Sequence, residues 1–137
     1  MRTIAFAIIT MGKSDYLEGM LKSLEKYERV ILVDNSPNGI CKRLIGKYKF
    51  IYFHELKAGV SSARNAGASL AQDVDYIYFL DDDLSFGEEW HRELERMLTS
   101  DEYFDLIGGR VIADYSDDLI IPQKYLYLVG EKDRKRH

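Results

Sequence analysis

Residues 78–86 read YFLDDDLSF, and this short stretch gives the strongest indication of the fold. The apolar run DYIYFLD, which starts at residue 75, leads there into three consecutive acids, Asp81, Asp82 and Asp83. Such a run predicts a buried strand, and the acids stand at its end. Like charges about 4 Å apart repel by roughly 4 kcal/mol at an effective dielectric constant near 20. The three acids therefore need a partner that neutralises them.

Similar apolar runs recur along the chain and alternate with amphipathic stretches. The predicted strands cover residues 4–10, 29–35, 49–55, 75–81, 106–114 and 124–130, and the predicted helices cover residues 14–27, 40–45, 60–72 and 88–98. This alternation favours parallel βαβ units with right-handed crossovers. We therefore predict an α/β fold, with a mostly parallel sheet flanked by helices.

Composition and charge narrow the class of protein. The chain has 137 residues, of which 46% are hydrophobic and 31% charged, and this predicts a single domain over residues 1–130 with a flexible charged tail at 131–137. A net charge of -4 argues against nucleic acid as a partner. No apolar stretch approaches the roughly 20 residues of a membrane span. The single cysteine, Cys41, excludes an internal disulfide, and we expect a cytoplasmic protein.

Polar residues end three of the predicted strands: Thr10 ends the first, Asp34 the second, and the acids the fourth. Ligands of open parallel sheets bind beyond the carboxyl ends of the strands, so these residues converge on one site if the strands are neighbours. Side chains alternate along a strand, which places Asp81 and Asp83 on one side and Asp82 on the other. We predict that Asp81 and Asp83 bind Mg²⁺ or Mn²⁺, which prefer oxygen ligands.

Helix capping is the alternative role for the acids, because acids favour helix N-termini. Ser85 followed by Glu88 has the pattern of a capping box and predicts the start of the helix at 88–98. Ser14 is likewise predicted to cap the helix at 14–27. Capping therefore accounts for at most one of the three acids.

The segment LKAGVSSARNAGAS, residues 56–69, is a second candidate for ligand binding. Gly59 allows the backbone to approach a ligand closely, and Lys57 and Arg64 carry charge that suits a phosphate. The small residues of the segment have an alternative purpose, which is to let a helix lie close to the sheet. Both interpretations are compatible with one another.

Four segments in order, ITMGKSDYLEGMLKSL, VDNSPNG, AGVSSARNAG and FLDDDLSF, resemble the nucleotide-binding half of the family 2 glycosyltransferases. The similarity covers roughly residues 4–113. It implies a GT-A fold, here in a shortened form. It also implies a nucleotide-diphosphate sugar as donor, with UDP favoured, and a metal-assisted transfer of the sugar to an unidentified acceptor hydroxyl.

The resemblance assigns roles to individual residues. Thr10 matches a residue beside the nucleotide, Asp34 the acid that binds the base, and Asp81 to Asp83 the Asp-x-Asp motif, whose first acid binds ribose and whose last binds the metal. Arg64 and Asn65 match an Ala-Arg-Asn segment near the sugar-phosphate. The predicted nucleotide-binding residues are thus Thr10, Asp34, Lys57, Gly59, Arg64, Asp81 and Asp82, and the predicted catalytic residues are Asp83 and Asp114.

The chain departs from the family in its length, because the family's catalytic domain usually continues further and supplies the acceptor site and a base. The only downstream acid cluster is ADYSDD, which makes Asp114 the candidate base and has a solvated loop as its alternative interpretation. A non-catalytic nucleotide-sugar-binding module, or a fragment of a longer transferase, is therefore the alternative function. A phospho-receiver domain fits less well, because its first strand should end in acids rather than in Thr10.

Overall fold

The computed structural model describes residues 1–109. Contacts divide the chain into one unit from Met1 to Asp101 and a second unit that begins at Glu102. All the helices and strands described below belong to the first unit. A strand was predicted at 106–114, but residues 106–109 have no strand conformation. Three predicted features lie outside the described residues: the rest of that strand, the strand at 124–130 and the domain boundary at residue 130.

The sheet of the first unit has four parallel strands in the order β3-β2-β1-β4. The strands are β1 (Ile4–Thr10), β2 (Val30–Asp34), β3 (Ile51–His54) and β4 (Tyr76–Asp81). β1 and β2 are buried along almost their whole length because they occupy the centre of the sheet. The continuous apolar runs at 4–10 and 29–35 follow from this central position. β3 and β4 stand at the two ends of the strand order and are only partly buried, so the prediction of a buried strand at 75–81 holds only for Leu80. The prediction of a mostly parallel α/β fold is confirmed.

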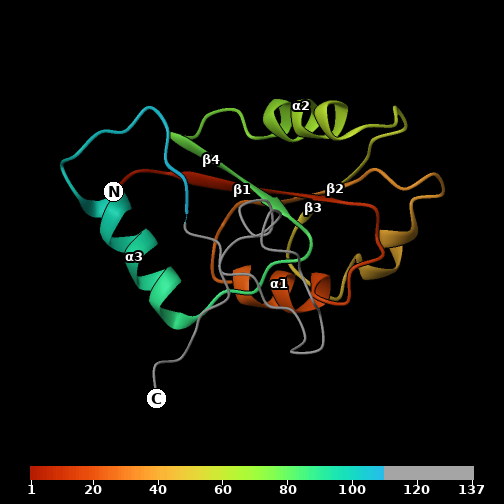
Figure 1. The fold of residues 1–137 in the computed structure, drawn as a ribbon, viewed down its shortest axis with the longest axis horizontal. Helices are drawn as coiled ribbons and strands as arrows, with labels where there is room; N and C mark the ends of the chain where they lie inside the picture. Colours follow the sequence, from red (N-terminus) through yellow and green to blue (C-terminus); the bar gives the residue numbers. More distant parts are fainter. Residues whose placement is uncertain (110–137) are drawn as a thin grey trace, which may run out of the picture. The chain divides into compact units, whose positions relative to one another are not determined.

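Helices cover both faces of the sheet, with α2 on one side and α1 on the other (Figure 1). The helices are α1 (Leu17–Leu24), the 3₁₀ helix η1 (Ile40–Leu44), α2 (Val60–Leu70) and α3 (Glu88–Thr99). The larger part of the core lies on the α1 side, where Phe6 and Ile8 of β1 pack with apolar residues of α1 and α3. A smaller core, built around Ile9 and Ala63, lies under α2.

The small residues of α2 allow this helix to lie close to the sheet. A Cβ atom placed on Gly67 would come within 3.0 Å of the Cβ atom of Ala7 and 3.6 Å of Cγ2 of Val33. Ala63, one turn earlier, is fully buried. The close-packing interpretation of this segment is therefore confirmed, while Asn65 of the same helix is exposed.

Both predicted helix caps are wrong. The predicted helix start at residue 88 matches α3, which begins at Glu88, but the N-cap is Gly87 and Ser85 lies outside the helix. Gly87 itself is extended, with a φ of -82° and a ψ of 166°, and the ring of Phe86 before it stacks on Trp90 at a centroid distance of 4.2 Å. The helix α1 begins at Leu17, after Tyr16, and Ser14 only accepts a hydrogen bond from the Tyr16 N–H at 3.2 Å.

Candidate functional site

The carboxyl ends of the four strands lie at one edge of the sheet, and their polar residues are in register. Thr10 of β1 is paired with Asp34 of β2, and Asp34 is paired with His54 of β3. On the other side of β1, Ile9 is paired with Asp81 of β4. The neighbouring strands therefore bring together the residues that the sequence predicts at this edge.

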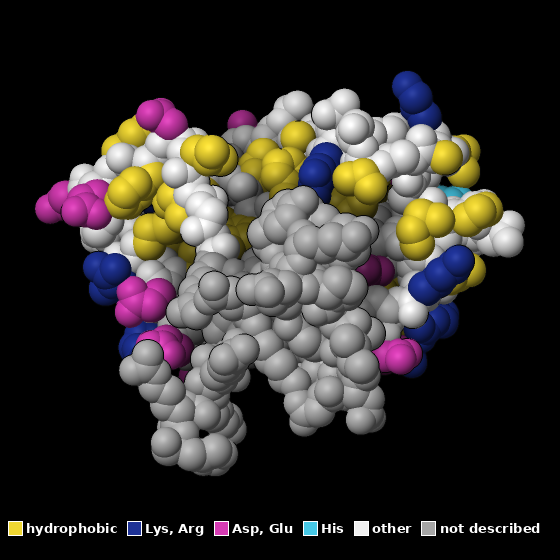
Figure 2. All heavy atoms as spheres, in the orientation of Figure 1, with side chains coloured by type: hydrophobic (Ala, Val, Ile, Leu, Met, Phe, Trp, Pro, Cys, Tyr) yellow, Lys and Arg dark blue, Asp and Glu magenta, His cyan; other side chains and the backbone are white. Residues whose placement is uncertain are grey.

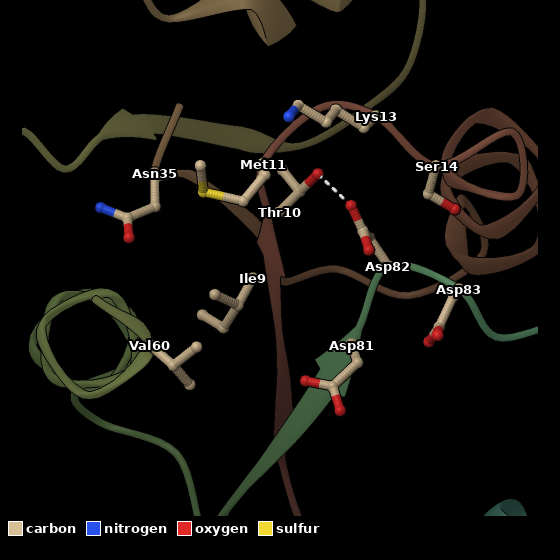
Figure 3. A pocket seen from close by; sticks show the side chains of 10 residues that line it. All are labelled: Ile9, Thr10, Met11, Lys13, Ser14, Asn35, Val60, Asp81, Asp82 and Asp83. Carbon is tan, nitrogen blue, oxygen red and sulfur yellow. Dashed lines mark hydrogen bonds between the residues drawn. The ribbon is translucent and has the colours of Figure 1, made fainter. Parts of the chain in front are cut away.

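A cleft of about 310 Å³ opens at this edge, and Figure 3 shows the side chains around it. It is lined by Ile9, Thr10, Met11, Lys13, Ser14, Asn35, Val60, Asp81, Asp82 and Asp83. Four of the predicted site residues are among them: Thr10 and the three acids. The lining does not include the predicted residues Asp34, Lys57, Gly59 and Arg64.

The three acids have different surroundings. Asp82 accepts a hydrogen bond from the hydroxyl of Thr10, and Asp81 forms an ion pair with Arg64, with 3.3 Å between Oδ1 and Nη2. Among the described residues Asp83 has neither a hydrogen bond nor an ion pair. Figure 3 shows Asp81 and Asp83 directed away from the side on which Asp82 meets Thr10, as the alternation of side chains predicts.

Thr10 fixes the position of Asp82 through a chain of two bonds. Its hydroxyl oxygen accepts a hydrogen bond from the Gly12 N–H at 2.7 Å and donates its own proton to the Asp82 carboxylate. The Thr10 side chain is itself buried, with 2% exposed. Asp82 is thereby tied to the end of β1 rather than to solvent or to its own turn.

Asp34 is fully buried, and its carboxylate is occupied by three donors of the protein. One oxygen accepts the Ser36 N–H at 2.9 Å, and the other accepts the Cys41 N–H at 2.8 Å and the Tyr52 hydroxyl at 3.0 Å. Burial alone would raise the pKa of Asp34, but these hydrogen bonds outweigh it, and the pKa lies below its ordinary value. Asp34 thus holds the loop after β2 in place, and its contact with a base stays a prediction.

Cys41 has no sign of reactivity. Burial, together with the nearby Asp34 charge, raises the pKa of its thiol to about 11, so the group is protonated at neutral pH. Cys41 is therefore an inert residue of the core.

Asn35 is a functional candidate that the sequence analysis did not single out. Its amide donates to the backbone oxygens of Glu55 and Lys57 at 2.8 and 2.9 Å, and its Oδ1 accepts the Gly59 N–H at 2.9 Å. One side chain on the cleft wall therefore holds the loop that leads into α2. A polar residue directly after a buried strand was the signal for it.

The predicted residues Lys57 and Gly59 occupy this loop. The side chain of Lys57 is exposed. Gly59 is the N-cap of α2 with a φ of 124°, a conformation that only glycine adopts without strain. The next residue, Val60, lines the cleft. Asn35 and Gly59 together thus place the start of α2 beside the acids.

The described residues contain no group of three or more His, Cys, Asp or Glu side chains that could hold a metal ion on their own. The pair of carboxylates Asp81 and Asp83 nevertheless fits a metal such as Mg²⁺, which takes one or two protein carboxylates and completes its shell with phosphate oxygens and water. The residues present therefore suit a metal that is bound jointly with a phosphorylated ligand. The predicted base Asp114 and its neighbours Asp117 and Asp118 lie outside the described residues.

The comparisons with known proteins place this site in a family. The family model for glycosyl transferase family 2 matches residues 6–137, which is nearly the whole chain. The chain belongs to glycosyl transferase family 2. The parallel sheet with helices on both faces is accordingly GT-A-like, and the acids stand at the end of β4.

Searches among curated proteins and among solved structures returned no match to this family 2 domain. Within residues 1–109, no helix has the length and apolar character needed to cross a membrane. The described atoms of the face in Figure 2 carry acidic, basic and apolar side chains intermixed, without a continuous basic stripe. Family membership supports a glycosyltransferase-type function for this chain.

Proposed function

We propose that this family 2 domain binds a nucleotide-diphosphate sugar, with UDP as the favoured nucleotide, in the cleft at the carboxyl edge of the sheet, and that it transfers the sugar to an acceptor hydroxyl. The observation that carries the proposal is the cluster of three carboxylates around the cleft, one of which, Asp83, has no partner among the described residues. An anionic cleft attracts a diphosphate only through a cation, so the geometry favours a metal-dependent donor site.

Asp83, with Asp81 beside it, would hold the Mn²⁺ or Mg²⁺, which supplies Lewis-acid stabilisation of the leaving diphosphate. In the transfer, the bond between the sugar's anomeric carbon and the diphosphate oxygen breaks, and a bond from that carbon to the acceptor oxygen forms. The nucleoside diphosphate leaves with the bonding electrons, and the acceptor's proton passes to a base. Asp114 stays our predicted base.

The other cleft residues have roles in orientation. Thr10 holds Asp82 in place, which keeps this third carboxylate directed away from Asp83. Asn35 fixes the loop at Lys57 and Gly59, whose backbone lies beside the start of α2. A base or ribose that binds above β1 and β2 would therefore meet surfaces that are preorganised.

Calorimetry with UDP, in the presence and in the absence of Mn²⁺, tests the donor site. We expect binding only when the metal is present. Equal affinity without metal would contradict the metal-dependent site, and no binding in either condition would contradict the nucleotide. Release of UDP from UDP-sugars in the presence of acceptor alcohols then separates a transferase from a non-catalytic binding module. A cytoplasmic location stays a prediction.

A further inference from the structure

The ion pair between Arg64 and Asp81 makes two of the predicted functions compete. Asp81 is a predicted metal ligand, but its Oδ1 lies 3.3 Å from Nη2 of Arg64. Arg64 is a predicted phosphate ligand, but its guanidinium is engaged by that carboxylate. Neither side chain is confined, because 66% of the Asp81 side chain and 46% of the Arg64 side chain are exposed.

Of the three carboxylates, Asp83 is the one at which a metal ion would compete with no other described residue. Asp82 is held by Thr10, and Asp83 has no partner among the described residues. Lys13 also lines the cleft, yet Figure 3 shows its side chain on the other side of Thr10 from Asp81 and Asp83. The guanidinium of Arg64 thus neutralises Asp81 at the position where a metal ion would bind.

We propose that Arg64 is exchanged between two partners: it pairs with Asp81 in the free protein, and it transfers to the diphosphate when a metal takes its place on Asp81. This inference rests on the proposed donor site. The exchange makes the metal and the diphosphate bind cooperatively, because the metal releases the guanidinium that the diphosphate then engages. By linkage, the nucleotide strengthens metal binding by the same factor.

If Arg64 is exchanged in this way, a single substitution should strengthen the binding of metal alone and weaken the binding of UDP. Arg64→Ala should tighten the binding of Mn²⁺ alone, because the competitor at Asp81 is gone. Exposed ion pairs are weak, so the gain should be about two- to fivefold. The same variant should weaken UDP binding at saturating Mn²⁺ by about tenfold or more, because a charged hydrogen bond to the diphosphate is lost.

Titration of free Mn²⁺ by electron paramagnetic resonance measures the first effect, and calorimetry with UDP measures the second. Lys13→Ala is the matched control, since it removes the same charge from a residue that lines the cleft with the three acids, without breaking the pair. It should change the affinity for Mn²⁺ alone by a smaller factor than Arg64→Ala does. In an Asp81→Asn background, Arg64→Ala should no longer tighten Mn²⁺ binding, because Asp81 is the group for which metal and arginine compete.

The outcomes separate this inference from the proposed function. Unchanged Mn²⁺ affinity in Arg64→Ala overturns the exchange, even if UDP binding weakens. Equal tightening in Lys13→Ala, or undiminished tightening in the Asp81→Asn background, also overturns it, since only the summed charge would then matter. If the wild-type protein binds Mn²⁺ but no nucleotide, the proposed donor site is wrong, and the Mn²⁺ titrations still decide whether Arg64 and metal compete for Asp81.

Discussion

Replacing Asp34 by alanine should strongly destabilise the fold. The substitution leaves the backbone N–H groups of Ser36 and Cys41 without their acceptor, and both residues are buried. An unpaired buried donor costs about 1–3 kcal/mol, so the two together cost roughly 2–6 kcal/mol. The Tyr52 hydroxyl also loses its acceptor, but this residue is only half-buried, and water can replace the bond. We expect a loss of about 4 kcal/mol in the free energy of unfolding.

Urea denaturation followed by the fluorescence of Trp90 measures this loss, because Trp90 is the only tryptophan and packs against the core. The control is Tyr52→Phe, which removes one donor and leaves both backbone bonds, and should cost no more than about 1 kcal/mol. A loss below about 1 kcal/mol for Asp34→Ala would refute the reasoning, because it would mean that the loop after β2 does not depend on the carboxylate.

The pH dependence of the free energy of unfolding is a second test of the role of Asp34. The folded-state pKa of Asp34 lies below its ordinary value, so the ionised group contributes stability above its unfolded pKa of about 3.9. This contribution is lost as the pH falls through the folded pKa. The wild-type protein should therefore lose stability below about pH 4, and the difference between wild type and Asp34→Ala should shrink over the same range.

Two further predictions concern the acids and the packing of α2. Asp83→Asn should abolish metal-dependent UDP binding while Asp82→Asn only reduces it, as measured by calorimetry on folded variants, and the reverse ranking would make Asp82 the metal ligand. Gly67→Val should destabilise the protein by about 2 kcal/mol in urea, because its side chain meets Ala7, whereas Gly19→Ala in α1, where nothing lies within 4 Å, should be neutral or stabilising by up to about 1 kcal/mol. A tolerated Gly67→Val would show that α2 moves freely on the sheet.

The strands within residues 1–109 could be predicted from the sequence because the central ones are buried on both faces and therefore apolar without interruption. The runs at 4–10 and 29–35 correspond to β1 and β2. The helix starts predicted at residues 60 and 88 match α2 and α3, but the residues that cap the helices could not be predicted in the same way. Ser14 and Ser85 have the residue types of caps, but α1 begins only at Leu17, and the N-cap of α3 is Gly87.

The candidate site likewise contains residues that could be predicted from the sequence and residues that could not. The acids and Thr10 could be predicted because they directly follow apolar strands, and the strand register then brings them to one cleft. Met11 and Val60 also line the cleft, yet no feature of their residue type indicates it. The burial of Asp34 was also not foreseeable, because its donors come from η1 and from β3, and their position depends on the folded chain.

The hydrogen bond between Thr10 and Asp82 joins residues that are 72 positions apart in the chain. Thr3 and Asp75 are joined at the same separation near the other end of these strands. β4 therefore docks beside β1 only after the five intervening elements, from α1 to α2, and their connections have been synthesised, and closing so long a loop is slow relative to forming local contacts. During refolding, fluorescence changes at Trp90 and the onset of metal-dependent nucleotide binding should coincide, because the strand that carries the acids also leads into α3.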